Sequence, residues 1–222
     1  MPGGKRTDLI SQRDLEVLEF IARFGVVPRS AVAAWAGTAR TVTIVREGRL
    51  RKADLIRVTR GMGEGGPYAA CTVAGLRASG RRELAEASFS WTAFSHHAVV
   101  ARVAAQMERS GQSLLSEREI LALERAEGVH ALSATLSNDK PHRADLIRVD
   151  ERGEPFEAIE VELTTKGAAR LDELMRAWRR AVVERRVTRV VYRCAPRTRR
   201  YVERAIERTR TTEMIDVEDL WR

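Results

Sequence analysis

Two glutamates stand two residues apart in an apolar stretch of the second half of the chain. The stretch FEAIEVELTTKG runs from Phe156 to Gly167 and holds Glu160 and Glu162, with Lys166 four residues after the second glutamate. Side chains of a strand alternate between its two faces, so both carboxylates would share one face. That face is either an ordinary solvent-exposed face of the strand, or it brings carboxylates together in a catalytic or metal-binding site.

A third carboxylate is predicted on the same face. Two strand-like runs flank residues 151–154, and we expect a hairpin with Asp150 opposite Pro155. The same antiparallel register places Asp145 directly opposite Glu160. Opposed carboxylates repel each other, so a cation or basic groups must compensate them. Because Mg²⁺ and Mn²⁺ prefer carboxylate oxygens, Asp145 and Glu160 are the candidate metal ligands.

The carboxylates also have a purely structural interpretation. Glu160 and Glu162 would then be paired with basic side chains inside a scaffold that performs no chemistry. The nearby sequence supplies several candidates for this pairing, namely Arg143, Arg148, Arg179 and Arg180.

Composition narrows the class of protein. The 222 residues are 44% hydrophobic and 32% charged, which is typical of a globular protein with a core. We find no apolar run near the roughly 18 residues of a membrane span, and the N-terminus lacks the apolar region of a secretory signal. Cys71 and Cys194 have no partner motif, which favours buried thiols in a reducing compartment. We therefore expect a cytoplasmic protein.

The charge distribution favours a polyanionic partner. The net charge is +8 and the pI about 10.3, and 35 of the 39 basic residues are arginine, the better fork for phosphate. Residues 40–60 carry a net charge of +5 and residues 176–210 carry +10, whereas residues 139–173 between them carry −4. An acidic island between two basic segments is hard to explain as random surface charge.

The first basic segment lies within a recognisable order of elements. Ser11 and Asp14 form a capping box that opens a helix ended by Gly25. A short second helix closes at Gly37, and Thr38 is predicted to cap a third. Two strands around the glycine-rich run GMGEGGP then predict a hairpin. Three helices followed by a hairpin is the winged-helix order, in which the third helix enters the major groove.

We expect double-stranded DNA as the partner of this region. The exposed face of the third helix would read bases through Arg40, Thr41, Thr43 and Arg46, and basic residues would hold phosphates. The alternative is that the same surface binds a protein. A homodimer is also compatible with the sequence. The predicted DNA-binding residues are Arg40, Thr41, Thr43, Arg46, Arg49, Arg51, Lys52, Arg57 and Arg60.

The second half of the chain predicts the order helix, strand, strand, strand, helix, strand, helix. This order resembles the PD-(D/E)XK phosphodiesterase fold of restriction endonucleases. From Leu9 to Val217 the chain resembles the replication-relaxation proteins of bacterial plasmids and integrative elements. The resemblance implies an α+β protein, with a winged helix-turn-helix in residues 1–82 and a restriction-endonuclease-like α/β/α core with a mixed sheet in residues 83–222.

The resemblance also assigns roles to residues. Asp145 matches the motif aspartate, and Glu160 matches the acidic residue of the (D/E)XK segment. The chain departs from the pattern twice, because Ala144 replaces the preceding proline and Glu162 stands where the catalytic lysine belongs. Lys166 is the candidate substitute for that lysine. The catalytic set is therefore Asp145, Glu160, Glu162 and Lys166, and an additional helix acid would come from Glu108, Glu117 or Glu119.

Three functions follow from these patterns. The first is a double-stranded DNA-binding protein that acts in replication, mobilisation or transcriptional control of a plasmid, phage or integrative element, with a degenerate nuclease-like domain. The alternative is a DNA endonuclease or nickase that depends on Mg²⁺ or Mn²⁺. A protein-binding adaptor ranks third.

Overall fold

The computed structural model describes residues 10–60, 66–89 and 94–221. The chain divides into two compact units, unit 1 (Met1–Ser110) and unit 2 (Gly111–Arg222). The boundary expected after residue 82 falls inside unit 1. None of the described helices is long and apolar enough to cross a membrane.

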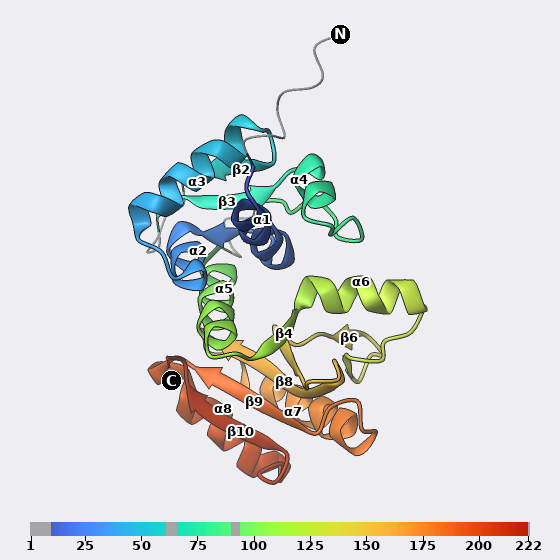
Figure 1. Cartoon of the computed structure of the whole chain (residues 1–222). Coiled ribbons are helices and arrows are strands. Elements are labelled where there is room, and N and C mark those ends of the chain that lie inside the picture. The colour runs from blue at the N-terminus through green and yellow to red at the C-terminus, as the bar shows by residue number, and fades with distance from the viewer. Residues whose placement is uncertain (1–9, 61–65, 90–93, 222) are drawn as a thin grey trace. The chain divides into compact units, whose positions relative to one another are not determined.

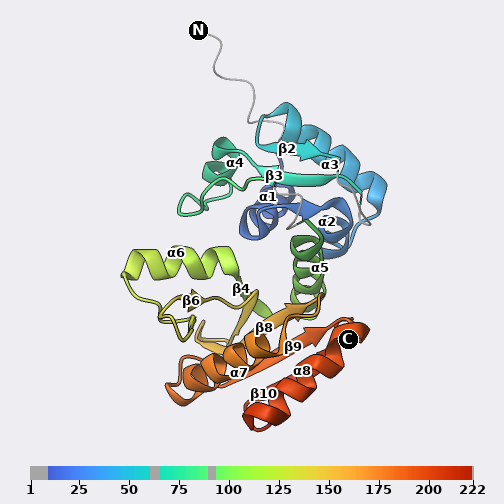
Figure 2. The same cartoon turned by 180° about the vertical axis from the view of Figure 1, so that it is seen from behind.

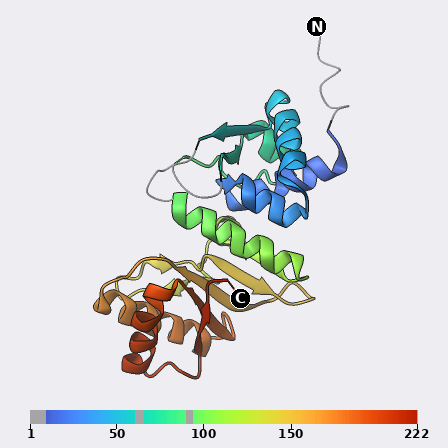
Figure 3. The same ribbon diagram turned by 90° about the vertical axis from the view of Figure 1, so that its left-hand side faces the viewer.

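Unit 1 combines helices with a small antiparallel sheet of order β1-β3-β2, which lies above α5 in Figure 3. The helix α5 packs against α2 within this unit. In chain order its described elements are α1 (Gln12–Phe24), β1 (Val27–Pro28), α2 (Arg29–Ala36), α3 (Arg40–Lys52), β2 (Ile56–Thr59), β3 (Tyr68–Cys71), α4 (Val73–Ala78) and α5 (Phe94–Arg109).

Local sequence signals fix the ends of the first two helices. Ser11 caps α1 in a capping box with Asp14, and Gly25 ends the helix, as predicted. Gly37 ends α2 with φ of 62°, a left-handed conformation that favours glycine.

The predicted cap of the third helix is wrong. Ala39 is the N-cap of α3 and contributes no side-chain bond, and the helix ends at Lys52 rather than continuing to Ile56. The Thr38 hydroxyl instead lies 3.3 Å from that of Thr43. The predicted hairpin is present as β2 and β3, with Ile56 opposite Cys71. Its glycine tip, residues 61–65, lies outside the described residues.

Unit 2 is built on a five-stranded mixed sheet of order β10-β9-β8-β7-β4. The α+β class and the mixed sheet are therefore confirmed. In chain order the described elements are β4 (Ser113–Ser116), α6 (Glu117–Glu127), β5 (Ala134–Thr135), β6 (Pro141–His142), β7 (Leu146–Val149), β8 (Pro155–Glu162), α7 (Ala168–Val183), β9 (Arg189–Cys194), α8 (Pro196–Thr209) and β10 (Ile215–Asp219).

The hairpin of β7 and β8 has the predicted register but not the predicted turn. Leu146 pairs with Ile159 and Arg148 with Glu157, as expected. An irregularity after Arg148 then pairs Val149, not Asp150, with Pro155. The Asp150 side chain leaves the ladder and accepts the backbone N–H groups of residues 152 and 154 at 2.9 and 2.8 Å.

Helices α7 and α8 pack side by side on one face of this sheet (Figures 1 and 2). Fully buried Trp178 of α7 lies in the core that the helices form with Ala158, Val190 and Tyr192. Gly167, rather than Thr164 or Thr165, is the N-cap of α7. Residues 158, 160 and 162 alternate with their neighbours along β8, so the two glutamates share the face that the helices cover.

Candidate nucleic-acid interface and carboxylate cluster

The inner face of α3 is held by a buried carboxylate of α1. Asp14 is fully buried, and its Oδ1 lies 2.8 Å from Arg46 Nη1 and 3.1 Å from Arg49 Nη2. Burial raises the pKa of Asp14, but hydrogen bonds from Ser11 and the charges of Arg49 and Arg46 outweigh burial and lower it. Both arginines therefore have a structural partner inside unit 1.

Two further positions of α3 face inward. Thr43 is 1% exposed, and its hydroxyl is 3.4 Å from the Ala39 carbonyl oxygen. Buried Glu47 accepts Arg29 Nε at 2.7 Å, and burial raises its pKa against the opposing effect of Arg29. Of the predicted base readers, Thr43 is therefore buried and Arg46 is turned toward Asp14, and their contact with bases stays a prediction.

The outer face of α3 combines apolar and basic side chains. Val42, Ile44 and Val45 are 44%, 43% and 62% exposed, although apolar residues of a folded unit are usually buried. Their exposure was not expected from the sequence, where only charged and polar side chains were predicted to contact DNA. Five predicted DNA-binding residues are also exposed on this helix, namely Arg40, Thr41, Arg49, Arg51 and Lys52, and of these Arg49 is paired with Asp14. We call the outward-facing set Arg40, Thr41, Val42, Ile44, Val45, Arg51 and Lys52 the outer α3 face.

The two arginines predicted to bind phosphate from the hairpin, Arg57 and Arg60, differ in their surroundings. Arg57 in β2 is half-exposed and forms an ion pair with Glu86 at 2.9 Å. Arg60 follows β2 and is exposed. Arg57 would have to exchange Glu86 for a phosphate, whereas Arg60 would not.

In unit 2, Glu160 lies at the centre of the carboxylate cluster, defined as Asp145, Glu160 and Glu162. Its side chain is 7% exposed, and Oε1 lies 2.7 Å from His142 Nε2 and accepts Trp178 Nε1 at 3.0 Å. Burial lowers the pKa of His142, but Glu160 and Asp145 more than reverse this effect and raise it. The side chains that contact Glu160 thus include an imidazole and an indole.

The predicted pairing of Asp145 with Glu160 is not part of the ladder, which begins with Leu146 opposite Ile159. Asp145 precedes β7, and its Oδ2 accepts the backbone N–H of Val161 at 2.7 Å. Its own carbonyl oxygen accepts the Glu117 N–H at 3.2 Å. The charges of Asp145 and Glu160 both act on His142, which places the two carboxylates in one electrostatic environment.

Glu162 is compensated by the lysine that follows it. Glu162 is 3% exposed and forms an ion pair with Lys166, the residue proposed as a migrated catalytic lysine. Burial raises the pKa of Glu162, and Lys166 acts in the opposite direction. The expected arginine partners of the cluster are engaged elsewhere or face away from it, since Arg143 pairs with Glu124, Arg148 with Glu157, and Arg180 with the Thr135 carbonyl.

Tyr192 is the unusual member of this environment. It lies opposite Glu160 in the parallel pairing of β8 with β9 and is fully buried. Its hydroxyl has no hydrogen-bond partner among the described residues. Burial, and then the charges of Glu160 and Glu162, raise its pKa far above the usual value, so the hydroxyl keeps its proton.

The candidates for an additional helix acid have structural partners. Glu108 lies in unit 1, where it pairs with Arg23 at 2.7 Å and accepts Trp35 Nε1 at 2.6 Å. Glu119 closes the capping box of α6 with Ser116. Glu117 is the first residue of that helix, and its backbone contacts Asp145 as described above.

The carboxylates of the cluster are already engaged by groups of the chain. Each of them accepts a donor, from Val161, from His142 with Trp178, or from Lys166. Within residues 10–60, 66–89 and 94–221 no group of three or more His, Cys, Asp or Glu side chains is arranged to hold a metal ion.

Comparison of the sequence with protein-family models and with curated proteins finds no match for this chain. The function is therefore argued from the two sites themselves.

Proposed function

We propose that the protein binds double-stranded DNA through the outer α3 face of unit 1. The observation that carries this proposal is the mixed character of that face, where exposed Val42, Ile44 and Val45 lie between Arg40 at one end and Arg51 and Lys52 at the other. Basic side chains suit phosphates, and apolar side chains suit thymine methyl groups in the major groove. A helix face that contacts only water is normally polar, so three exposed branched apolar residues on one face favour a binding surface.

The order of elements in unit 1 supports the same proposal. Three helices precede a hairpin whose second strand pairs with β1, as in a winged helix. Gly37 allows the sharp turn between α2 and α3, and the Asp14 pairs fix one side of α3 against α1. A helix held so firmly on one side presents its other side as a preorganised surface.

For unit 2 we propose a nuclease-like scaffold in the PD-(D/E)XK order rather than an active phosphodiesterase. The support is that His142, Trp178 and Lys166 satisfy the carboxylates that a catalytic site would leave open. We therefore derive no metal-dependent step. An exchange at Glu160 combined with addition of Mn²⁺ tests this interpretation, as set out in the Discussion.

An endonuclease or nickase is the second candidate, and one observation favours it. The Tyr192 hydroxyl is a buried donor next to the carboxylate cluster without a partner among the described residues. A buried donor of this kind requires an acceptor, and an ordered water held beside the cluster would supply one. Stabilisation by Mn²⁺ that disappears in Glu160→Gln would establish this function instead.

The biological setting is proposed from the resemblance alone. We infer a cytoplasmic role in replication, mobilisation or transcriptional control of a plasmid, phage or integrative element, as for replication-relaxation proteins. Binding of the outer α3 face to duplex DNA is the first step that this role requires. Duplex affinity after an exchange at Val45, which is 62% exposed, tests that step directly.

A further inference from the structure

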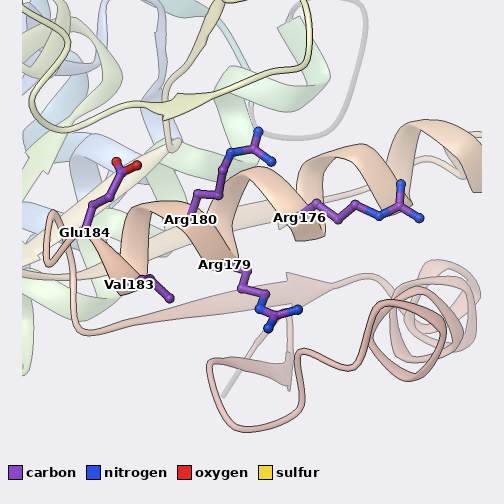
Figure 4. A pocket seen from close by; sticks show the side chains of 5 residues that line it. All are labelled: Arg176, Arg179, Arg180, Val183 and Glu184. Atoms are coloured by element: carbon purple, nitrogen blue, oxygen red, sulfur yellow. The ribbon is translucent and has the colours of Figure 1, made fainter.

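The outer side of α7 carries a row of arginines that the proposed function does not use. Arg176, Arg179, Arg180 and Val183 follow the spacing of one helical face. With Glu184 they line a hollow of about 330 Å³, and Figure 4 shows Arg179 and Arg180 pointing to opposite sides of α7 while Arg176 points along the helix. We call these five residues the α7 groove.

A second hollow extends the α7 groove toward the start of the helix. It measures about 310 Å³ and shares Arg176 and Arg180 with the first. Its other lining residues are Ser137, Ala169 and Glu173. The arginines thus lie at the middle of a longer surface depression along α7.

The positive charge of this surface is not compensated locally. Among the described residues, Arg176 and Arg179 form no ion pair or hydrogen bond. The two lining glutamates are engaged elsewhere, since Glu173 accepts Arg170 at 2.8 Å and Glu184 pairs with Arg186 at 2.7 Å. Arg176 and Arg179 are therefore exposed, and their N–H groups are available to bind a ligand.

Contacts with the rest of unit 2 hold part of this surface in place. Arg180 donates to the Thr135 carbonyl oxygen, which fixes its side chain along α7. Val183, which also lines the α7 groove, is 64% exposed. A single exposed valine is too little apolar surface for a peptide anchor, which is normally a buried aromatic or large side chain.

Spacing and chemistry fit a phosphodiester backbone. Arginines one turn apart are separated by about 5.4 Å along the helix, and a duplex carries one charge per about 1.7 Å of its axis. Each guanidinium can therefore reach a different phosphate and form a forked pair with its oxygens.

We propose that the α7 groove is a second, sequence-independent binding surface for the backbone of duplex DNA. The inference extends the proposed function of unit 1 from one DNA-contacting surface to two. It assigns to unit 2 a binding role that does not depend on the carboxylate cluster.

The test compares salt dependence of DNA binding in the full chain. The variant R176Q/R179Q is matched by R125Q/R152Q, which removes the same charge from two exposed arginines of α6 and the β7–β8 turn. Anisotropy of a labelled mixed-sequence duplex is titrated at several salt concentrations. Loss of two phosphate contacts should reduce the slope of log affinity against log salt by about 1.8 in R176Q/R179Q, and the control should keep the wild-type slope.

Three other outcomes decide between this inference and the proposed function. Equal slopes for R176Q/R179Q and R125Q/R152Q would overturn the inference, whatever happens at α3. Full binding by an α3 variant, with the slope still reduced in R176Q/R179Q, would uphold the inference and refute the proposed function. Polyglutamate that binds the wild type as well as DNA does, but not R176Q/R179Q, would identify an acidic protein as the partner and overturn the inference.

Discussion

Asp14 of α1 and Arg46 of α3 form an ion pair of 2.8 Å in which the carboxylate is fully buried and the arginine side chain is 11% exposed. Arg46 lies in the most basic stretch of unit 1, yet it holds the helix in place instead of facing outward. The basic residues of α3 therefore divide into a structural pair, Arg46 and Arg49, and an outward group.

The first prediction separates these two groups. Arg46→Ala leaves Asp14 with fewer partners in a buried position, so it should lower the free energy of unfolding by about 1.5–3 kcal/mol. Arg51→Ala, at an exposed position of the same helix, should change it by less than about 0.5 kcal/mol. Denaturant unfolding measures both, and equal effects would show that the Asp14 contact does not stabilise α3.

The second prediction concerns pH. The pKa of His142 is raised in the folded state, so protonation of this histidine stabilises the fold. The stabilisation is fully present below the pKa of histidine in the unfolded chain, about 6.5. It is lost as the pH rises through the pKa of the folded state. The charged groups acting on it are Glu160, Asp145 and Arg170. The melting temperature of the wild type should exceed that of His142→Asn most at about pH 5.5, and the gap should shrink toward about pH 8.5. A gap that grows with pH would contradict the pairing with Glu160.

A third prediction addresses the scaffold. Glu160→Gln weakens the charged hydrogen bonds from His142 and Trp178, so it should destabilise the fold by about 1–3 kcal/mol. A vacant metal site predicts the reverse sign, because removing one of several like charges would relieve repulsion. Mn²⁺ should leave the melting temperature of the wild type unchanged. Specific stabilisation by Mn²⁺ that is absent in Glu160→Gln would support the endonuclease.

Tyr192 gives the fourth prediction. Because its buried hydroxyl has no partner among the described residues, Tyr192→Phe removes an unsatisfied polar group and keeps the ring. The variant should be as stable as the wild type or more stable, by up to about 1–3 kcal/mol. Ala158→Ser, at a buried position two residues before Glu160 on the same strand face, introduces a hydroxyl and serves as the opposite control. Clear destabilisation by Tyr192→Phe would mean that the hydroxyl has a bound partner.

Local signals allowed much of the fold to be predicted. Ser11 with Asp14, Gly25 and Gly37 act on their own helix ends, so α1 and α2 could be delimited from sequence. The register of β7 and β8 was predicted from a loop at residues 151–154, and it holds from Leu146 to Arg148. The predicted pair next to the turn does not form, because the Asp150 side chain binds the turn backbone and the ladder shifts after Arg148.

The surroundings of Arg46 and Glu160 could not be predicted in the same way, because they are set by contacts between residues far apart in the sequence. Asp14 and Arg46 are 32 residues apart, so nothing near Arg46 indicated that it faces inward. Trp178 is 18 residues from Glu160 and was assigned no role, although an indole N–H in a buried helix needs an acceptor. Exposed Val42, Ile44 and Val45 could have been found from the weak amphipathic pattern of α3, which carries apolar residues on both sides.

Duplex affinity of Val45→Asp tests the central proposal most directly. Val45 is 62% exposed on the outer α3 face, so the exchange should leave the melting temperature nearly unchanged. It places a carboxylate where the proposal puts DNA, and the affinity measured by anisotropy should fall at least about tenfold, which corresponds to about 1.4 kcal/mol. Val129→Asp, at a valine of unit 2 that is 52% exposed and lies outside both proposed DNA-binding surfaces, controls for the added charge. Wild-type affinity in a folded Val45→Asp variant would contradict DNA binding by α3.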